Sequence, residues 1–494
     1  MKNMDEVSKK IMEMGLTDRR SITSPENGRL GGRKPIPVQS WAAQFVESKY
    51  SIDLNGKPFY TLHYYAGEWY CYNAHWHTLK EDDLRSEVTG FLQKIECPAR
   101  ISTSLVGDII LNIKSSEICA ILPKENKYKM PCFLSNGECA ADWMPMQNRI
   151  VNIESAAEAL ANGAAVPSTA IREQSPELFI TFGLPYSFDE AATCPKWEKY
   201  LSETQPNEEN RKCLQMLAGL ALVTDRRYNV MFFLYGEAGT GKSVFLEVLQ
   251  ALVGKDNTCH VPLSKMSERF ATAPLTEKRL NAIGDMPIIP ENGRIADVEG
   301  LLKDMAPGGE ISVERKGIDG WDAPVIALNV FATNELPPFT DRSNGIWDRL
   351  RIIPFNQRFR GTDQQNPNLI NELLEELPGI LIWALKGLAM LRKLKTFPEC
   401  AEGEAEKEKL RGECDHERTF LLEHTEPATG SWCSSDRLYQ KYKEWMLNNG
   451  YRPVCAGKFK KAVQRLYPQA YVNKSSIDGT RIWRFWNIRE KSDF

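Results

Sequence analysis

The sequence lacks any apolar run long enough to cross a membrane. A spanning helix needs about 18 consecutive apolar residues, and the N-terminus also lacks the apolar core of a secretion signal. The net charge of −3 indicates no partner by itself, so a nucleic-acid surface would have to be local. We therefore expect a soluble, cytoplasmic protein with no membrane partner.

Cysteine pairs at metal-binding spacing are also absent. None of the twelve cysteines forms a Cys-x-x-Cys pair, and no histidine follows Cys132 and Cys139 at zinc-finger spacing. This pattern does not support a zinc site and favours free, mostly buried thiols in a reducing compartment. There is no internal repeat either.

What is present is the composition of an ordinary globular protein, with 42% hydrophobic and 26% charged residues. The length of 494 residues suggests about three domains. Composition shifts predict a flexible N-terminal arm, an α+β domain, a central domain, a helical extension with a linker, and a small C-terminal domain. The corresponding ranges are 1–38, 39–205, 206–360, 361–414 and 415–494.

The N-terminal part has mixed signals. Gln39–Ser48 and Asp82–Gln93 have helical spacing. Phe59–Trp76 is rich in aromatics and is interrupted at Ala66-Gly67, which predicts a β-hairpin or meander. A further strand is expected around Asn148–Ile153.

After residue 206 helices and strands alternate, which predicts a parallel, doubly wound α/β sheet. The expected strands are 228–235, 279–283 and 324–332, and the expected helices are 214–223, 244–253 and 369–394.

The strand 228–235 leads directly into a glycine-rich loop that fits G-x-x-x-x-G-K-[ST]. Its glycines let backbone N–H groups turn toward phosphate oxygens, and the following helix adds its positive end. Lys242 would reach the β- and γ-phosphates of ATP, and the Ser243 hydroxyl would bind Mg²⁺. The loop consists of Gly236, Glu237, Ala238, Gly239, Thr240, Gly241, Lys242 and Ser243.

Three polar elements downstream suit the same site. Asp285 ends an apolar strand and could hold Mg²⁺ through water, although a lone Asp there is more often a turn residue. Asn334 follows another strand and could orient the attacking water, or simply cap a turn. Arg349 and Arg351 precede a further strand, and an arginine there could reach a neighbouring subunit's γ-phosphate.

Together these elements resemble the superfamily 3 helicases, and within them the phage/plasmid primase-helicase group that includes the poxvirus-type enzymes. The family's elements appear as ATNELP at 332–337 and GIWDRLRIIPF at 345–355, and Gly236 and Asn334 lie 98 residues apart. The resemblance covers about 206–360 firmly and 175–201 more loosely. It implies a ring-forming ATPase of the extended (AAA+) type.

The resemblance also implies roles for single residues. Lys242 and Ser243 would bind nucleotide and metal, Asp285 would be the Walker B acid, and Asn334 would be sensor 1. Arg349 would be the arginine finger, which requires nucleotide to lie between subunits of an oligomer, most simply a hexamer.

A DNA-gripping pore loop occurs in this family between the Walker B acid and sensor 1. Here that segment is 301–324, and its basic tip would contain Arg315 and Lys316, which can track a phosphate backbone. Lys303 is a second candidate contact, but a position on a helix face suits it better.

The chain departs from the family at the Walker B position. Many relatives have two acids in tandem, whereas Met286 follows Asp285 here. The general base is therefore Asp285 alone or Glu291. Residues 1–200 have no paired-aspartate strand with a histidine, so we do not expect priming activity.

The C-terminal residues 451–494 contain ten Lys/Arg against three Asp/Glu. Helices at 434–448 and 456–466, followed by two strands around the turn at Asp478-Gly479, predict a winged helix. Its second helix would place four basic side chains against DNA, although a protein-docking module remains an alternative. These are Lys458, Lys460, Lys461 and Arg465.

The sequence thus predicts an ATP- and Mg²⁺-dependent DNA helicase of replication, in the setting of a phage, plasmid or integrated element, with DNA and replication proteins as partners. The alternatives are a DNA-stimulated ATPase that loads or remodels without unwinding, a defence or regulatory scaffold, and a primase-helicase with cryptic priming activity.

Overall fold

The computed structural model describes residues 38–121, 130–285, 295–305, 309–315, 318–339, 344–363, 365–477 and 480–491. The chain splits into two compact units. One is Met1–Asn152 with Ile171–Ser187, and the other is Ile153–Ala170 with Phe188–Phe494. The boundary expected after residue 205 falls within the second unit, and the five-part division of the chain stays a prediction.

Three amphipathic helices form the core of the first unit. They are α2 (Val38–Lys49), α3 (Glu81–Lys94) and α4 (Thr103–Ser115). Apolar side chains at helical spacing, such as Leu84, Val88 and Leu92 of α3, are buried among them. The helices expected at 39–48 and 82–93 are confirmed, and α4 is additional.

Short antiparallel strands make up the rest of this unit. The aromatic stretch forms the meander β3-β4-β5, and Ala66 and Gly67 adopt positive φ at its first turn, so the predicted meander is confirmed. The strands are β1 (Ser51–Leu54), β2 (Lys57–Tyr60), β3 (Leu62–Tyr65), β4 (Glu68–Asn73), β5 (His75–Leu79), β6 (Cys132–Phe133), β7 (Trp143–Pro145), β8 (Ile150–Asn152), β9 (Ile171–Arg172) and β10 (Leu178–Phe179).

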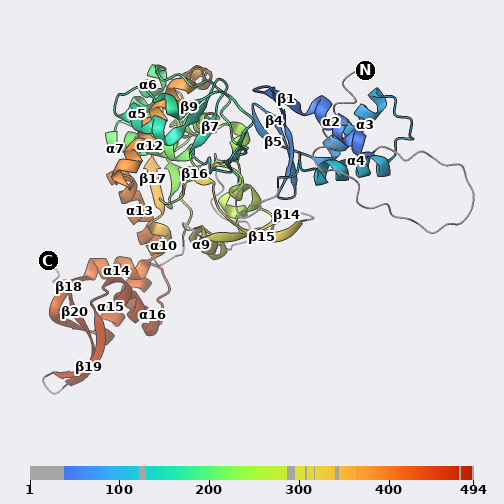
Figure 1. Cartoon of the computed structure of the whole chain (residues 1–494). Helices are drawn as coiled ribbons and strands as arrows, with labels where there is room; N and C mark the ends of the chain where they lie inside the picture. The colour runs from blue at the N-terminus through green and yellow to red at the C-terminus, as the bar shows by residue number, and fades with distance from the viewer. Residues whose placement is uncertain are drawn as a thin grey trace, which may run out of the picture. The chain divides into compact units, whose positions relative to one another are not determined.

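The second unit is built on a five-stranded parallel sheet, as predicted. Its order is β12-β13-β16-β11-β17, so β16 lies between β13 and β11. Figure 1 labels β16 and β17 of this sheet. Near-continuous apolar sequence explains the burial of its strands on both faces. The strands are β11 (Met231–Tyr235), β12 (Thr258–Cys259), β13 (Leu280–Ile283), β16 (Leu328–Thr333) and β17 (Leu350–Pro354).

One group of helices packs together beside this sheet. Two of them, α7 and α12, cross very closely at Gly387. A Cβ added at Gly387 would lie only 2.1 Å from the Gln215 backbone oxygen. This group comprises α5 (Ile153–Ala161), α6 (Pro195–Thr204), α7 (Glu208–Ala221), α8 (Lys242–Val253), α11 (Leu369–Leu374) and α12 (Leu377–Leu394).

A second core joins the sheet to α9 (Ile295–Asp304), α10 (Asn344–Trp347) and α13 (Ala401–Cys414). Phe233 and Phe331 of adjacent strands lie in this core with Trp347 of α10. Short 3-10 helices connect the strands at Ser168–Ala170, Lys255–Asn257, Leu263–Lys265 and Ala273–Thr276.

Two sequence-based element assignments need correction. The strand expected at 324–332 begins later, as β16, because Pro324 ends β15 (Ile318–Pro324) and three residues connect the two strands. The helix expected at 369–394 is divided into α11 and α12, with Pro378 in the first turn of α12, where proline's missing N–H costs nothing.

The C-terminal part of the second unit has three helices and an antiparallel sheet of order β18-β20-β19. The helices predicted at 434–448 and 456–466 are confirmed. The sequence did not predict the helix at His416–His424 or the strand at Thr425–Ser434. The elements are α14 (His416–His424), β18 (Thr425–Ser434), α15 (Ser435–Asn448), α16 (Ala456–Leu466), β19 (Tyr471–Ile477) and β20 (Thr480–Glu490). The turn at Asp478-Gly479 lies outside the described residues.

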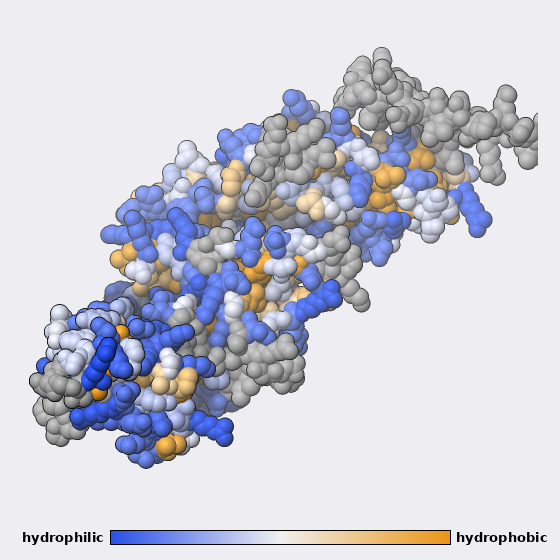
Figure 2. Space-filling model, turned by 90° about the horizontal axis from the view of Figure 1, so that it is seen from below, coloured by the Kyte–Doolittle hydropathy of each residue, from blue (hydrophilic) through white to orange (hydrophobic). Residues whose placement is uncertain are grey.

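Within the described part of the chain no helix combines the length and hydropathy that a bilayer span requires. The longest helix of the second unit, α12, contains the charged residues Lys386, Arg392 and Lys393. On the face seen in Figure 2, apolar residues form separate patches among hydrophilic ones.

The close crossing of α7 and α12 predicts that Gly387→Ala destabilises the second unit by about 1–3 kcal/mol, since the added methyl group overpacks a backbone contact. Urea unfolding followed by tryptophan fluorescence measures the loss. Gly300→Ala in α9 is the matched control. Nothing lies within 4 Å of its new Cβ, so it should be neutral or stabilise by up to about 1 kcal/mol. Equal effects of the two changes would contradict the close packing.

Candidate functional site

The candidate site lies at the carboxyl ends of the parallel strands. The strand β11 runs into the loop 236–243, which continues into α8, while β13 ends just before Asp285 and β16 just before Asn334. In open α/β sheets ligands bind outside this edge, near the point where the strand order reverses. The sheet order therefore brings all three segments to one edge.

The glycines of the loop have conformations and contacts that a side chain would disturb. Gly236 has a φ of 151°, and a Cβ there would lie 2.3 Å from the Phe355 carbonyl oxygen. Gly239 has a φ of 85° and accepts a hydrogen bond of 2.9 Å from the Phe359 N–H. Gly241 precedes α8 in the left-handed region at 97°.

Lys242 holds the loop together. Its buried ammonium group donates to the Gly236 carbonyl at 2.5 Å, the Glu237 carbonyl at 2.7 Å and the Asn334 Oδ1 at 3.0 Å. Burial lowers the pKa of Lys242, and the charge of Asp285 acts in the opposite direction. Lys242, Asn334 and Asp285 are thus neighbours in the folded chain.

The oxygen groups beside Lys242 suit a hard cation. Ser243 in the first turn of α8 and Asp285 after β13 are both exposed, and hydroxyl and carboxylate oxygens are ligands that Mg²⁺ accepts. Asp285 has a φ of 46°, which is uncommon for a residue with a side chain. Met286 and Glu291, which bear on the general base, lie outside the described residues.

Sequence reasoning missed the residues that support the loop from outside. The Tyr200 hydroxyl donates to the Gly241 carbonyl at 2.9 Å, and its ring stacks on Trp197. Arg358 forms an ion pair with Glu237, and Arg360 contributes a backbone hydrogen bond to Gly239. Two sequence signals could have pointed to these residues. They are the loose family resemblance over 175–201, which contains Tyr200, and the two arginines shortly after the GIWDRLRIIPF element.

Arg349 lies far from this edge within the same chain. It directly precedes β17, whose Leu350 pairs with Met231 at the start of β11. Five strand residues at about 3.3 Å each place it roughly 16 Å from the loop. Its guanidinium donates to the Leu302 carbonyl of α9 at 2.5 Å.

The segment expected to grip DNA is an antiparallel hairpin of β14 (Glu310–Arg315) and β15. Ile311 and Val313 alternate as expected and are buried against α9. Arg315 ends β14, but its side chain and the whole of Lys316 lie outside the described part. Lys303 is on α9, as the sequence suggested.

The four basic C-terminal candidates on α16 differ in their surroundings. Lys458 and Lys461 are exposed on the helix surface. The Lys460 ammonium lies 5.0 Å from the ring centroid of Trp483. Arg465 forms a 3.0 Å ion pair with Asp415, which also caps α14, so this side chain has a structural contact.

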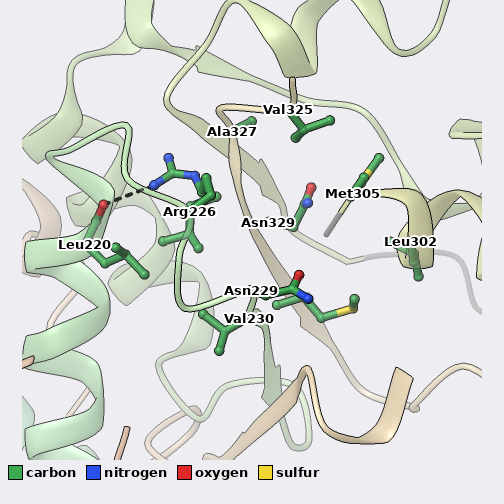
Figure 3. Close-up of a pocket in the computed structure, with 11 residues that line it drawn as sticks. Leu220, Arg226, Asn229, Val230, Leu302, Met305, Val325, Ala327 and Asn329 are labelled. Carbon is green, nitrogen blue, oxygen red and sulfur yellow. Dashed lines mark hydrogen bonds between the residues drawn. The ribbon is translucent and has the colours of Figure 1, made fainter. Parts of the chain in front are cut away.

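A small cavity lies at the opposite, amino-terminal end of the sheet (Figure 3). It is lined mainly by apolar residues together with Arg226, Asn229 and Asn329. Arg226 is half-buried and donates to carbonyl oxygens at the end of α7 and beyond, including that of Val223 at 2.9 Å. These hydrogen bonds stabilise the C-terminal end of α7. Desolvation lowers the pKa of the Arg226 guanidinium to about 9.

Fold and site together define an α/β protein with a strand–glycine loop–helix at the edge of a parallel sheet. Residues 234–349 match the model of a family described as a family of unknown function (DUF5906). This segment includes the loop, Asp285, Asn334 and Arg349.

Two curated proteins are similar in sequence. Protein 121R of Invertebrate iridescent virus 3, named as a candidate helicase, is 23% identical over 283 residues, or 51% of this chain. The mitochondrial protein ymf21 of Marchantia polymorpha is 30% identical over 111 residues, or 20% of this chain. The matched regions span 30% and 62% of those two proteins.

Solved structures of the NrS-1 C-terminal region share the fold. One apo structure has a TM-score of 0.54 at 12% identity and covers 92% of this chain and all of that one. A second, the A form, has a TM-score of 0.51 at 11% identity and covers 85% and 94%. The similarity extends over both compact units.

The tight approach at Gly236 predicts that Gly236→Ala destabilises the second unit by about 2–4 kcal/mol. The cost combines an unfavourable φ with a clash against Phe355. Gly361→Ala is the control, because its φ is also positive at 81° but nothing lies within 4 Å of the new Cβ. It should cost only about 1–2 kcal/mol in the same urea titration. If both variants lose equal stability, the backbone contact with Phe355 is not what requires glycine.

Proposed function

We propose that this protein is an ATP-dependent DNA helicase of replication that forms a ring. The observation that carries the proposal is the meeting of Lys242, Asn334 and Asp285 beside the glycine loop. This set provides a cation for phosphate, an amide for water and a carboxylate for Mg²⁺. The helicase name of protein 121R supports the same class of activity.

ATP would bind with its phosphates in the loop 236–243, where Gly236, Glu237, Ala238, Gly239, Thr240 and Gly241 supply the backbone. Lys242 would exchange its present carbonyl acceptors for phosphate oxygens. Ser243 and Asp285 would hold Mg²⁺, which neutralises charge on the transferred phosphoryl group. Asn334 would orient the attacking water, and the proton would pass to Asp285 or Glu291.

The position of Arg349 favours a site shared between subunits. At roughly 16 Å from its own loop it cannot serve the same chain's γ-phosphate, whereas a neighbour in a ring could receive it. A hexamer of the extended (AAA+) P-loop type satisfies this requirement. Arg349 would leave the Leu302 carbonyl and stabilise the charge that develops in the transition state.

Two surfaces would contact DNA. Arg315 and Lys316 at the end of the β14–β15 hairpin would follow one strand through the ring, with Lys303 as a secondary contact. The order of the C-terminal elements from α14 to β20 supports a winged helix, in which α16 would present Lys458, Lys460, Lys461 and, if released from Asp415, Arg465.

In this protein a collar or partner domain, the ATPase, a helical extension and the winged helix would occupy 39–205, 206–360, 361–414 and 415–494, respectively. Replication of a phage, plasmid or integrated element is the proposed setting, with other replication proteins as further partners.

We predict that Lys242→Ala lowers ATP hydrolysis by about 100-fold or more, because it removes a charge used in the transition state. Lys316→Ala should keep DNA-independent hydrolysis but lose unwinding. A forked-DNA unwinding assay with a coupled ATPase assay measures both. Lys255→Ala, which alters an exposed lysine away from the site, is the matched control. Hydrolysis without unwinding by the unaltered protein at every salt concentration would instead support a loader or scaffold.

We predict that Arg349→Ala lowers hydrolysis by about 10³-fold or more while ATP still binds, since a trans-acting arginine stabilises only the transition state. Mixing this variant with Lys242→Ala protein should restore part of the activity, because mixed interfaces contain one intact site. Arg351→Ala, two residues further along and within β17, is the control and should remain active. An absence of rescue, with ATP-dependent oligomers verified by mass, would contradict a shared site.

A further inference from the structure

The two faces of the C-terminal three-stranded sheet differ in what they contact. Cys433, Phe485 and Val472 lie opposite one another on β18, β20 and β19 and pack into the core with α14, α15 and α16. Side chains alternate along a strand, so the neighbours of these three residues point to the other face.

That other face presents three aromatic rings in register. Trp432 pairs with Trp486, and Trp486 pairs with Tyr471 on the opposite side. We refer to these three residues as the aromatic row. Trp432 is 38% and Tyr471 is 49% exposed, and no member belongs to the buried core of this domain. The Tyr471 and Trp486 rings are almost parallel, at an interplanar angle of 9°.

Polar groups lie beside the row. The next register position holds Arg484 with Ser434 and Asn473. The Arg484 guanidinium lies 4.3 Å from the Trp432 ring centroid and donates to the Ser475 hydroxyl at 2.7 Å. A cation beneath an exposed indole ring fixes the ring in place and polarises its face.

The chemistry of this face favours nucleic acid over an apolar protein partner. Flat aromatic rings with the exposed Asn473 amide beside them suit base stacking and base-edge contacts, while the buried Arg484 supports the Trp432 ring from below. Residues 451–494 contain ten basic and three acidic side chains, so the surroundings attract phosphate. The acids Glu426 and Glu490 of the same sheet are paired with Arg489 and Lys441.

We propose that the aromatic row binds single-stranded DNA by stacking its bases, on the sheet face opposite α16. This inference rests on the proposed function. The aromatic row would hold one DNA strand of a separated duplex, away from the proposed pore loop and from the surface of α16. Its binding step requires neither nucleotide nor translocation.

The test is the affinity of the full-length protein for fluorescein-labelled oligothymidylate, measured by anisotropy without nucleotide. Tyr471→Ala and Trp486→Ala should each weaken binding by roughly 5- to 30-fold, whereas Tyr471→Phe should retain it. The control is Trp483→Ala, which removes a ring of similar exposure (42%) that lies against Lys460 of α16, and it should change the affinity by less than about twofold.

A second readout separates stacking from charge. The salt dependence of binding should keep its slope in Tyr471→Ala, because no phosphate contact is lost, whereas Lys458→Ala should reduce it. Unchanged affinity of Tyr471→Ala and Trp486→Ala overturns the inference. A change of these two variants from a larger to a smaller oligomer also overturns it, because the aromatic row would then be a contact between copies of the chain.

Basal ATPase activity, which these residues do not touch, reports folding. ATP hydrolysis and unwinding by the unaltered protein test the proposed function separately from this binding.

Discussion

One ammonium group sets the geometry of the candidate site. Lys242 Nζ is buried and donates to two carbonyls of its own loop and to Asn334 at the end of β16. A buried cation without such partners would cost several kcal/mol. The loop, α8 and β16 therefore have to remain in contact, and any phosphate that binds must offer Lys242 acceptors at least as good as these.

The strand β17 connects this loop to the opposite end of the sheet. Its carboxyl end continues into Phe355, which lies against Gly236, and into Phe359, which donates to Gly239. Its amino end begins after Arg349, which contacts α9. In the proposed ring, a movement of Arg349 toward a neighbour's phosphate would act on a strand that also supports the chain's own loop. Because α9 packs on the β14–β15 hairpin, the same arginine is linked to the proposed DNA contact.

The C-terminal domain separates two kinds of surface chemistry. The helix α16 presents cations, of which Arg465 is also tied to Asp415, while the far side of the sheet presents aromatic rings. Cations follow a phosphate backbone and aromatic rings accept bases. A duplex has its bases stacked inside, so the two surfaces suit different forms of DNA.

The sequence alone determined the structural features that depend on residues adjacent along the chain. The loop 236–243 between a buried strand and a helix follows from contiguous glycines and apolar runs, and Asp285 and Asn334 could be placed at strand ends for the same reason. Only the tertiary structure put Asn334 against Lys242, because strand order is decided by packing between segments nearly 100 residues apart. The long strand β18 was not predicted because Pro427 and Gly430 interrupt the alternation of apolar and polar residues along it, and its register is irregular at the same place. Likewise, no local pattern could bring three aromatic side chains from three strands into one row. That arrangement depends on the register between strands, which the folded core fixes.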